Sequence, residues 1–152
     1  MAVTTRPAGS TDMSVPKPGD IAYNGGKIIS TTYLYTDMHD SSTLAATASR
    51  EEAARVFRGY LNVSTKIIRS LDGHIRSFDG DRVMGVFTGP GKQDRAVQAA
   101  MQIKWAVETQ VTPAIHADIP SLKSGGWYLK QSSGIATGDT LLARAGFRDN
   151  DD

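Results

Sequence analysis

The stretch His-Ile-Arg-Ser-Phe-Asp-Gly-Asp-Arg-Val-Met-Gly-Val-Phe at residues 74–87 decides the fold. Apolar and β-branched residues occur on both sides of its centre, and an Asp-Gly pair between two such runs is the strongest short-range signal for a β-hairpin. Asp79 fits that place as a turn former. We therefore expect two antiparallel strands, joined by a turn that carries Asp81.

Another predicted strand also ends in an aspartate. Residues 28–36 read Ile-Ile-Ser-Thr-Thr-Tyr-Leu-Tyr-Thr, which favours a buried strand, and Asp37 follows directly. If the two strand ends are neighbours in the sheet, Asp37 and Asp81 face each other. Two carboxylates in that arrangement can hold a hard divalent cation when phosphate oxygens supply the rest of the shell.

A long helix is predicted between these strands. Ser-Arg-Glu-Glu at residues 49–52 is a capping box, which marks a helix start. The helix should end near Leu71, with Gly73 just beyond it. Its apolar residues recur at steps of three and four, so they should share one buried face. They are Val56, Tyr60, Val63, Ile67 and Leu71.

A second, alanine-rich helix should begin near Asp94. Its apolar stripe consists of Val97, Met101, Trp105 and the alanines at positions 96, 99, 100 and 106. We expect this stripe to pack into the core rather than to form a cofactor site.

The remaining residues predict strands. Pro113 and Pro120 bracket an irregular connection. Residues 127–137 read as a strand, residues 138–139 as a turn, and residues 141–145 as the start of another strand. The predicted order β-α-β-β-α-β-β implies an α+β fold, a mixed sheet with helices on one face.

Composition bounds the class of protein. The 152 residues suit one domain, and 39% hydrophobic content is enough to bury a core. A net charge of +1 does not favour nucleic acid, and no apolar run is long enough to span a membrane. With no cysteine and no signal peptide, we expect a cytoplasmic protein. Residues 1–26, rich in Pro and Gly, read as a flexible arm, and residues 27–152 as the domain.

Four segments occur in the order and spacing of a known enzyme family. Asp-Met-His-Asp-Ser-Ser-Thr-Leu-Ala at residues 37–45 is similar to the family's Asp-Ile-x-Gly-Phe/Ser-Thr, with Asp40 where glycine is usual. Ser-Phe-Asp-Gly-Asp at residues 77–81 is similar to Lys-Phe-x-Gly-Asp. An alanine-rich helix follows, and then Gly-Ile-Ala-Thr-Gly-Asp at residues 134–139, similar to Gly-Ile-His-x-Gly-Glu. Residues 27–149 thus resemble the catalytic domain of class III nucleotidyl cyclases, with its ferredoxin-like (palm-type) sheet.

This resemblance implies a chemistry. Asp37 and Asp81 would hold two divalent cations, Mn²⁺ or Mg²⁺, with the Met38 carbonyl as a further ligand. Backbone N–H groups of residues 39–43, which include Ser41, Ser42 and Thr43, would hold the phosphates of a nucleoside triphosphate. The products would be a 3′,5′-cyclic nucleotide and pyrophosphate.

One departure from the family concerns the base. The lysine that reads adenine in adenylate cyclases, or the glutamate that reads guanine in guanylate cyclases, is Ser77 here. Tyr35 should share a face with Asp37 and could fill part of a base pocket. The Asp-x-x-x-Ser-Ser-x-Leu-Ala pattern that begins at Asp37 and the Ser77 position look like the uridylate cyclases of bacterial Pycsar anti-phage systems. We therefore expect UTP as the substrate, cyclic UMP as the product and a part in anti-phage signalling.

A second departure concerns the end of the chain. In the family, the segment after the position of Phe147 supplies an Asp for the base and then a transition-state Asn and Arg. This sequence ends at Asp152. We expect a domain truncated at its C-terminus, with doubtful activity on its own.

The resemblance also implies a homodimer with active sites between the subunits. Three alternatives remain open: an adenylate cyclase, a non-catalytic nucleotide-binding or dimerisation domain, and a palm-type enzyme such as a diguanylate cyclase. A diguanylate cyclase carries the sequence Gly-Gly-Asp/Glu-Glu-Phe in its hairpin. That motif is missing here, because the hairpin tip reads Phe-Asp-Gly-Asp at residues 78–81.

Overall fold

The computed structural model describes residues 2–7 and 9–144, which form one mixed sheet and a layer of helices. The order along the chain alternates between these layers. The strands are β1 (Ala2–Thr5), β2 (Gly25–Met38), β3 (His74–Asp79), β4 (Arg82–Phe87) and β5 (Gln131–Ala143). The helices are a 3₁₀ turn (Pro18–Asp20), α1 (Ser41–Thr47), α2 (Arg50–Ser70), α3 (Lys92–Ala106), a π-helical turn (Val107–Val111), α4 (Thr112–Asp118) and α5 (Pro120–Ser124).

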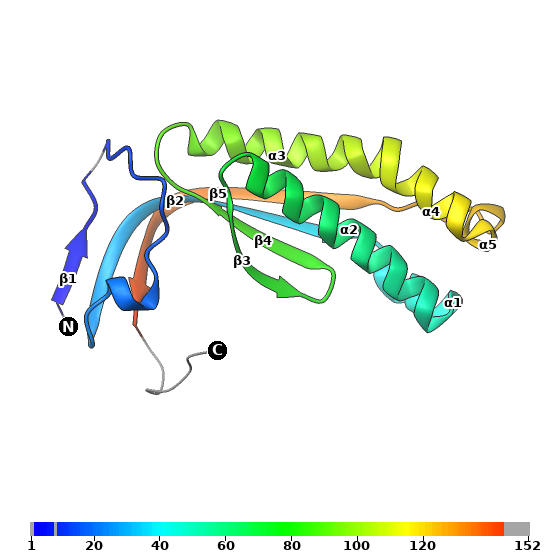
Figure 1. Cartoon of the computed structure of the whole chain (residues 1–152), viewed down its shortest axis with the longest axis horizontal. Helices are drawn as coiled ribbons and strands as arrows, with labels where there is room; N and C mark the ends of the chain where they lie inside the picture. Colours follow the sequence, from blue (N-terminus) through cyan, green and yellow to red (C-terminus); the bar gives the residue numbers. More distant parts are fainter. Residues whose placement is uncertain (1, 8, 145–152) are drawn as a thin grey trace.

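The sheet has the strand order β5-β2-β4-β3, and its central strand is β2. β4 and β5 both pair with β2 in antiparallel fashion, while β1 lies parallel to the first residues of β2. α2 packs against β3 and β4, and α3 against β2 and β5. Both helices lie on one side of the sheet (Figure 1). The predicted α+β, ferredoxin-like fold with helices on one face is confirmed.

The hairpin predicted around Asp79-Gly80 is present. Asp79 pairs with Arg82, so Gly80 and Asp81 form a two-residue loop. Gly80 has a φ of +60°, as the first residue of a type II′ hairpin turn requires, and glycine adopts such a φ without strain. The register shifts between Ile75 and Ser77, so Arg76 is the extra residue of a β-bulge.

The capping box begins α2 as predicted, with Ser49 and Glu52 bonding to each other's backbone N–H. The helix ends at Ser70 with Leu71 as its C-cap, close to the predicted end. The left-handed position after it is taken by Asp72, with a φ of +57°, and not by Gly73. Gly73 is needed for space, because a Cβ there would lie 2.6 Å from Cγ2 of Ile68 and 2.7 Å from the Phe87 ring.

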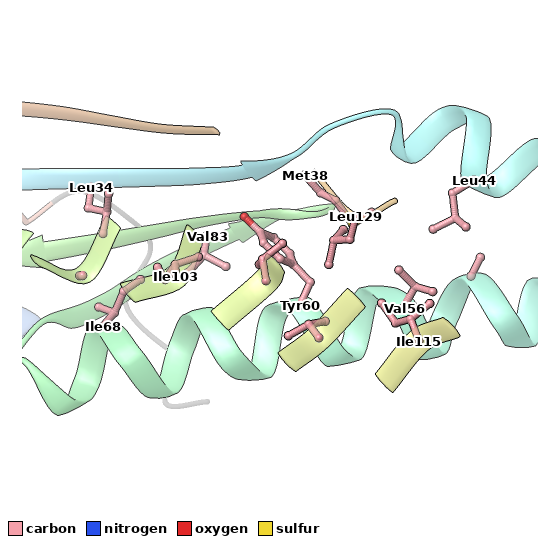
Figure 2. Packing of buried hydrophobic residues seen from close by; sticks show 14 of the residues in the cluster. Leu34, Met38, Leu44, Val56, Tyr60, Ile68, Val83, Ile103, Ile115 and Leu129 are labelled. Atoms are coloured by element: carbon pink, nitrogen blue, oxygen red, sulfur yellow. The ribbon is translucent and has the colours of Figure 1, made fainter. Parts of the chain in front are cut away.

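The core lies between α2, α3 and the sheet (Figure 2). Leu34 of β2, Tyr60 of α2 and Ile103 of α3 are fully buried there. The buried face of α2 is rotated slightly from the predicted one. Its fully buried residues are Val56, Tyr60, Ser64 and Ile68, whereas Val63, Ile67 and Leu71 are only partly buried.

The predicted core stripe of α3 is confirmed for Ala96, Ala99 and Ala106, and is wrong for its larger residues Val97, Met101 and Trp105. These side chains are 47%, 68% and 59% exposed. α3 instead faces the sheet with small residues and one isoleucine, which let the helix approach closely. They are Ala96, Ala99, Ile103 and Ala106. An alanine-rich helix has apolar residues on two faces, so periodicity alone did not distinguish them.

The C-terminal strands predicted as separate form one strand. β5 runs through residues 138–139, where a turn was expected, and it pairs with β2 along its whole length. Continuous pairing with a long central strand outweighs the local turn preference of Gly-Asp. The connection before β5 is more helical than predicted, because a π-helical turn joins α3 to α4 directly before Pro113. Such widened turns accommodate a change in the helical hydrogen-bond ladder.

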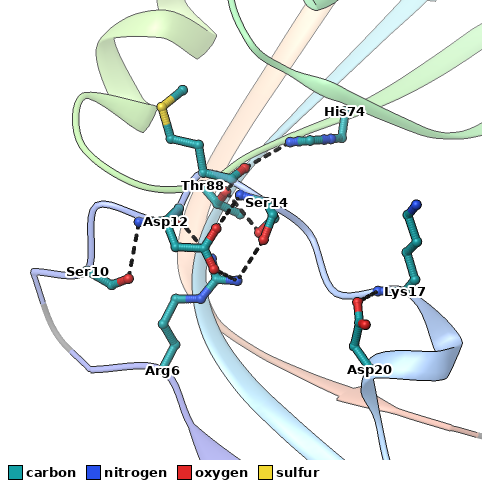
Figure 3. A network of polar contacts seen from close by, with 9 residues as sticks. Arg6, Ser10, Asp12, Ser14, Lys17, Asp20, His74 and Thr88 are labelled. Atoms are coloured by element: carbon teal, nitrogen blue, oxygen red, sulfur yellow. Dashed lines mark hydrogen bonds and ion pairs between the residues drawn. The ribbon is translucent and has the colours of Figure 1, made fainter.

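The N-terminal segment contacts the domain at several points (Figure 3). Arg6 forms an ion pair with Asp12 at 2.8 Å. The backbone carbonyl of Met13 accepts hydrogen bonds from Thr88 and from Nε2 of His74, the latter at 2.9 Å. The flexibility expected for residues 1–26 stays a prediction. No helix in the described part of the chain is long and apolar enough to cross a membrane.

Candidate metal and nucleotide site

The two aspartates singled out in the sequence lie at the same end of the sheet. Asp37 is the penultimate residue of β2, and Asp81 is the second residue of the hairpin loop. Thr36 pairs with Val83, so one step further along both strands Asp37 and Arg82 are opposite each other. Arg82 donates from Nη2 to Oδ2 of Asp37 over 3.2 Å. Both aspartates therefore lie at this end of the sheet, Asp37 paired with Arg82 and Asp81 directly before Arg82 in the chain.

One oxygen of Asp81 is left without a partner. Its Oδ2 is shielded from solvent and accepts no hydrogen bond from any described residue. A bare buried carboxylate oxygen is unfavourable, and a hard divalent cation is the kind of partner that would satisfy it. The described residues contain no cluster of three or more side chains that could ligate a metal. The two carboxylates thus fit a cation that takes its other ligands from phosphates and water.

Tyr60 reaches from α2 into the core near both aspartates. Its hydroxyl lies 2.7 Å from Oγ1 of Thr36. Burial, and less strongly the charges of Asp37 and Asp81, raise the pKa of Tyr60 to about 12, although the hydrogen bond with Thr36 opposes this. The hydroxyl is therefore neutral at ordinary pH. Helical periodicity identified Tyr60 only as a core residue. The cue for a polar role was that a buried tyrosine hydroxyl needs a partner.

Arg82 is the other residue that sequence reasoning missed. Its hydrogen bond to Asp37 and the charge of that carboxylate raise the pKa of Arg82, so it stays charged. Its Nη1 also lies 3.9 Å from Oδ2 of Asp79. The sequence cue for Arg82 was its position next to Asp81. Its pairing with Asp37 depends on the β2–β4 register, which a single sequence does not give.

A cavity of about 1010 Å³ opens between α1, α2 and the hairpin. Ser41 and Ser42, predicted to be near the phosphates, line it together with Asp81. Its apolar wall comes from Phe57, Leu61 and Phe78. Thr43 lies on the first turn of α1 but does not line the cavity.

The segment between Asp37 and α1 bends sharply. Met38 is 5% exposed, with its side chain in the core, so only its carbonyl is available to a cation. Asp40 precedes α1 with a φ of +56° and makes no side-chain cap. A φ in this range is easiest for glycine, which gives a physical reason for the glycine usual at this position in the family that the motifs resemble.

The residues predicted to contact the base lie across the helix-free face of the sheet. Ser77 pairs with Met84, Met84 with Tyr35, and Tyr35 with Gly134. Directly paired residues in antiparallel strands point to the same side, so Ser77 and Tyr35 share this face two strands apart. Tyr35 is 43% exposed and borders a cavity of about 460 Å³ with Tyr33, Gly134, Ile135 and Ala136.

The fold of this chain is that of class III nucleotidyl cyclase catalytic domains, and its strand-end aspartates and order of motifs resemble those of the family. Solved structures support the fold. A bacterial light-regulated adenylyl cyclase matches 80% of this chain and 33% of its own, with a TM-score of 0.69 and 23% identity. The dimeric guanylyl cyclase domain of the RhoGC fusion protein from the aquatic fungus Blastocladiella emersonii matches 82% of this chain and 66% of its own, with a TM-score of 0.62 and 16% identity.

In sequence, the chain is similar to uridylate cyclases. That of Rhodovulum sp. (strain MB263) is 35% identical over 133 residues, covering 87% of this chain and 55% of the relative. That of Burkholderia cepacia is 33% identical over 142 residues, covering 91% and 60%. Adenylate cyclase 1 of Rhizobium meliloti (strain 1021) is 25% identical over 118 residues, covering 78% and 17%. No protein-family model matches the chain. The chain spans 51–60% of the length of the uridylate cyclases it matches.

Proposed function

We propose that this chain carries the metal-binding part of a nucleotide cyclase that converts UTP to cyclic UMP and pyrophosphate. The observation that carries the proposal is that Asp37 and Asp81 lie at the same end of the sheet, where one oxygen of Asp81 is buried and unpartnered. In the reaction, the ribose 3′-oxygen bonds to the α-phosphorus and loses its proton. The bond from that phosphorus to the bridging oxygen breaks, and pyrophosphate leaves.

The residues have distinct parts in this scheme. The carboxylates of Asp37 and Asp81, with the Met38 carbonyl, would hold two divalent cations, Mn²⁺ or Mg²⁺. Bound there, such cations lower the pKa of an attacking hydroxyl and neutralise phosphate charge. Ser41, Ser42 and Thr43, in the first turn of α1, would present backbone N–H groups to the phosphates.

Two residues favour a pyrimidine base. Ser77 is too short to reach a purine edge as a lysine does, and Tyr35 narrows the same face of the sheet. The similarity to uridylate cyclases supports UTP. The distant similarity to an adenylate cyclase makes ATP the second candidate. We further place the product in anti-phage signalling, on the resemblance of the motifs alone.

We also propose that the enzyme works as a homodimer, with the helix-free face toward the partner. Tyr35, on this face, is half exposed. The guanylyl cyclase domain of the RhoGC fusion protein, which has a similar fold, is described as a non-canonical dimer. In such a dimer, the metal ligands of one subunit and the base-binding groups of the other would form one active site.

One assay tests the proposal. The purified full-length protein is incubated with Mn²⁺ and each of the four nucleoside triphosphates, and products are identified by mass. We expect cyclic UMP from UTP and little from the others. Asp81→Asn is the matched negative control, since it keeps the shape of the side chain. Cyclic AMP from ATP as the main product would replace UTP with the second candidate. Undiminished turnover by Asp81→Asn would refute the metal assignment.

A further inference from the structure

The two aspartates of the site are in unequal states. Oδ2 of Asp37 accepts a hydrogen bond from Arg82 at 3.2 Å, whereas Oδ2 of Asp81 is buried and has no described partner. Within the described residues, no other lysine or arginine forms an ion pair with either aspartate. One carboxylate is therefore already occupied by a cationic side chain, and the other is bare.

The position of Arg82 follows from the backbone. It is the first residue of β4 and pairs with Asp79 across the hairpin. On its other side, the ladder that pairs Thr36 with Val83 puts Asp37 opposite it. The strand register therefore places Arg82 between the carboxylates of Asp79 and Asp37, and cross-strand neighbours of opposite charge attract each other. A third carboxylate, that of Asp81, directly precedes Arg82 in the chain.

A guanidinium and a divalent cation compete for the same carboxylate oxygen. Arginine only donates hydrogen bonds and stays charged, so it cannot become a ligand. A cation such as Mg²⁺ on Asp37 would have to approach that oxygen to about 2.0–2.1 Å, where the Arg82 guanidinium now lies. Repulsion between the two positive charges adds to this competition.

We propose that Arg82 is a built-in counter-cation of the metal site. It neutralises Asp37 when no metal is bound and must leave that oxygen when a cation binds there. A first cation enters at Asp81 without displacing any group, and a second binds more weakly because it displaces Arg82. This inference rests on the metal site of the proposed function and deepens it.

The size of the effect should be modest. The side chains of Arg82 and Asp37 are 45% and 38% exposed, and ion pairs this open to water contribute little and are screened by salt. Removing the guanidinium should therefore tighten the weaker cation site by about two- to fivefold. The difference should shrink at high ionic strength.

The test measures Mn²⁺ binding without nucleotide, by titration calorimetry and by the electron paramagnetic resonance signal of free Mn²⁺. Wild type is compared with Arg82→Gln. The matched control is Arg76→Gln, which removes the same charge from an exposed bulge position on the same hairpin. We expect tighter binding for Arg82→Gln, little change for Arg76→Gln, and no effect of Arg82→Gln when Asp37→Asn is already present.

Each outcome decides between these roles. Unchanged or weaker binding by Arg82→Gln would overturn the inference and leave the metal site standing. An equal gain from Arg76→Gln would show a general effect of charge and overturn it as well. Loss of all Mn²⁺ binding from Asp81→Asn is expected. If neither wild type nor Arg82→Gln binds Mn²⁺, the metal site of the proposed function fails, and this inference fails with it.

Discussion

β2 and β5 lie side by side over thirteen paired positions, yet their surroundings are opposite. β2 is mostly buried, while residues 132–139 of β5 are all exposed. The reason is their place in the sheet. β2 has neighbours on both sides and helices above it, whereas β5 has β2 as its only neighbour among the described strands. The same ladder thus contains a strand that holds the fold together and a strand open to other contacts.

This contrast separates stability from recognition. Substitutions on β2 should affect the core or the metal site, and substitutions at the paired positions of β5 should be tolerated by the fold. Because directly paired residues share a face, each β5 residue is a matched control for its partner on β2.

The largest expected effect concerns Asp37 and its partner Ser132. Asp37→Asn should lower kcat/KM for the cyclisation by about 10³-fold, because charge stabilisation by a bound cation is worth several kcal/mol. Ser132→Ala should change it by less than about threefold, since a substitution on an exposed surface away from the chemistry is usually tolerated. Product formation from UTP is measured for both. Comparable losses would mean that this end of β5 also belongs to the reaction centre.

The next effect concerns Leu34 and its partner Ile135. Leu34 is fully buried and Ile135 is 40% exposed. Leu34→Ala should lower the free energy of unfolding by about 2–5 kcal/mol, through lost burial and a cavity. Ile135→Ala should cost less than about 1.5 kcal/mol, because much of its surface is already in water. Urea denaturation compares them. Equal losses would show that β5 is covered in solution.

A third prediction uses the neutral hydroxyl of Tyr60 on the covered side of β2. Its pKa is raised from 10.0 to about 12, so the folded chain keeps this proton where the unfolded chain loses it. Stability from this group is complete below pH 10 and is lost as pH rises toward 12. The loss should total about 2–3 kcal/mol.

Tyr60→Phe provides the control for that slope. Removing the hydroxyl takes away the hydrogen bond to Thr36 and costs about 0.5–1.5 kcal/mol at neutral pH. Between pH 10 and 12 the variant should lose less stability than wild type, so the two curves should converge and then cross. Curves that stay parallel across this range would show that Tyr60 does not titrate abnormally.

Local patterns were enough to predict the hairpin, the capping box of α2 and the two strand-end aspartates. Each of these rests on neighbours within a few residues. Long-range register decided the rest. The pairing of Arg82 with Asp37 needs the β2–β4 ladder, and the continuity of β5 through Gly138 needs the whole length of β2.

The prediction for the larger apolar residues of α3 was wrong for a different reason. Val97, Met101 and Trp105 are larger than the alanines, so pattern reasoning favoured them for the core. Close packing of α3 against the sheet selected the small residues instead. The size that fits an interface depends on how near the two elements lie, and one sequence does not contain that distance.

The smallest expected effect distinguishes two tyrosines on the open face of β2. Tyr33 donates its hydroxyl hydrogen bond to Oγ1 of Thr140 over 3.1 Å, so its oxygen is engaged within the sheet. Tyr35 is 43% exposed and borders a cavity, so its hydroxyl is accessible to a base. Tyr35→Phe should lower kcat/KM for UTP by about three- to tenfold, the usual worth of one hydrogen bond, with less effect on ATP. Tyr33→Phe should leave the UTP preference unchanged. Steady-state kinetics with both nucleotides measure this ratio, and an equal fall for the two variants would remove Tyr35 from the base-binding group.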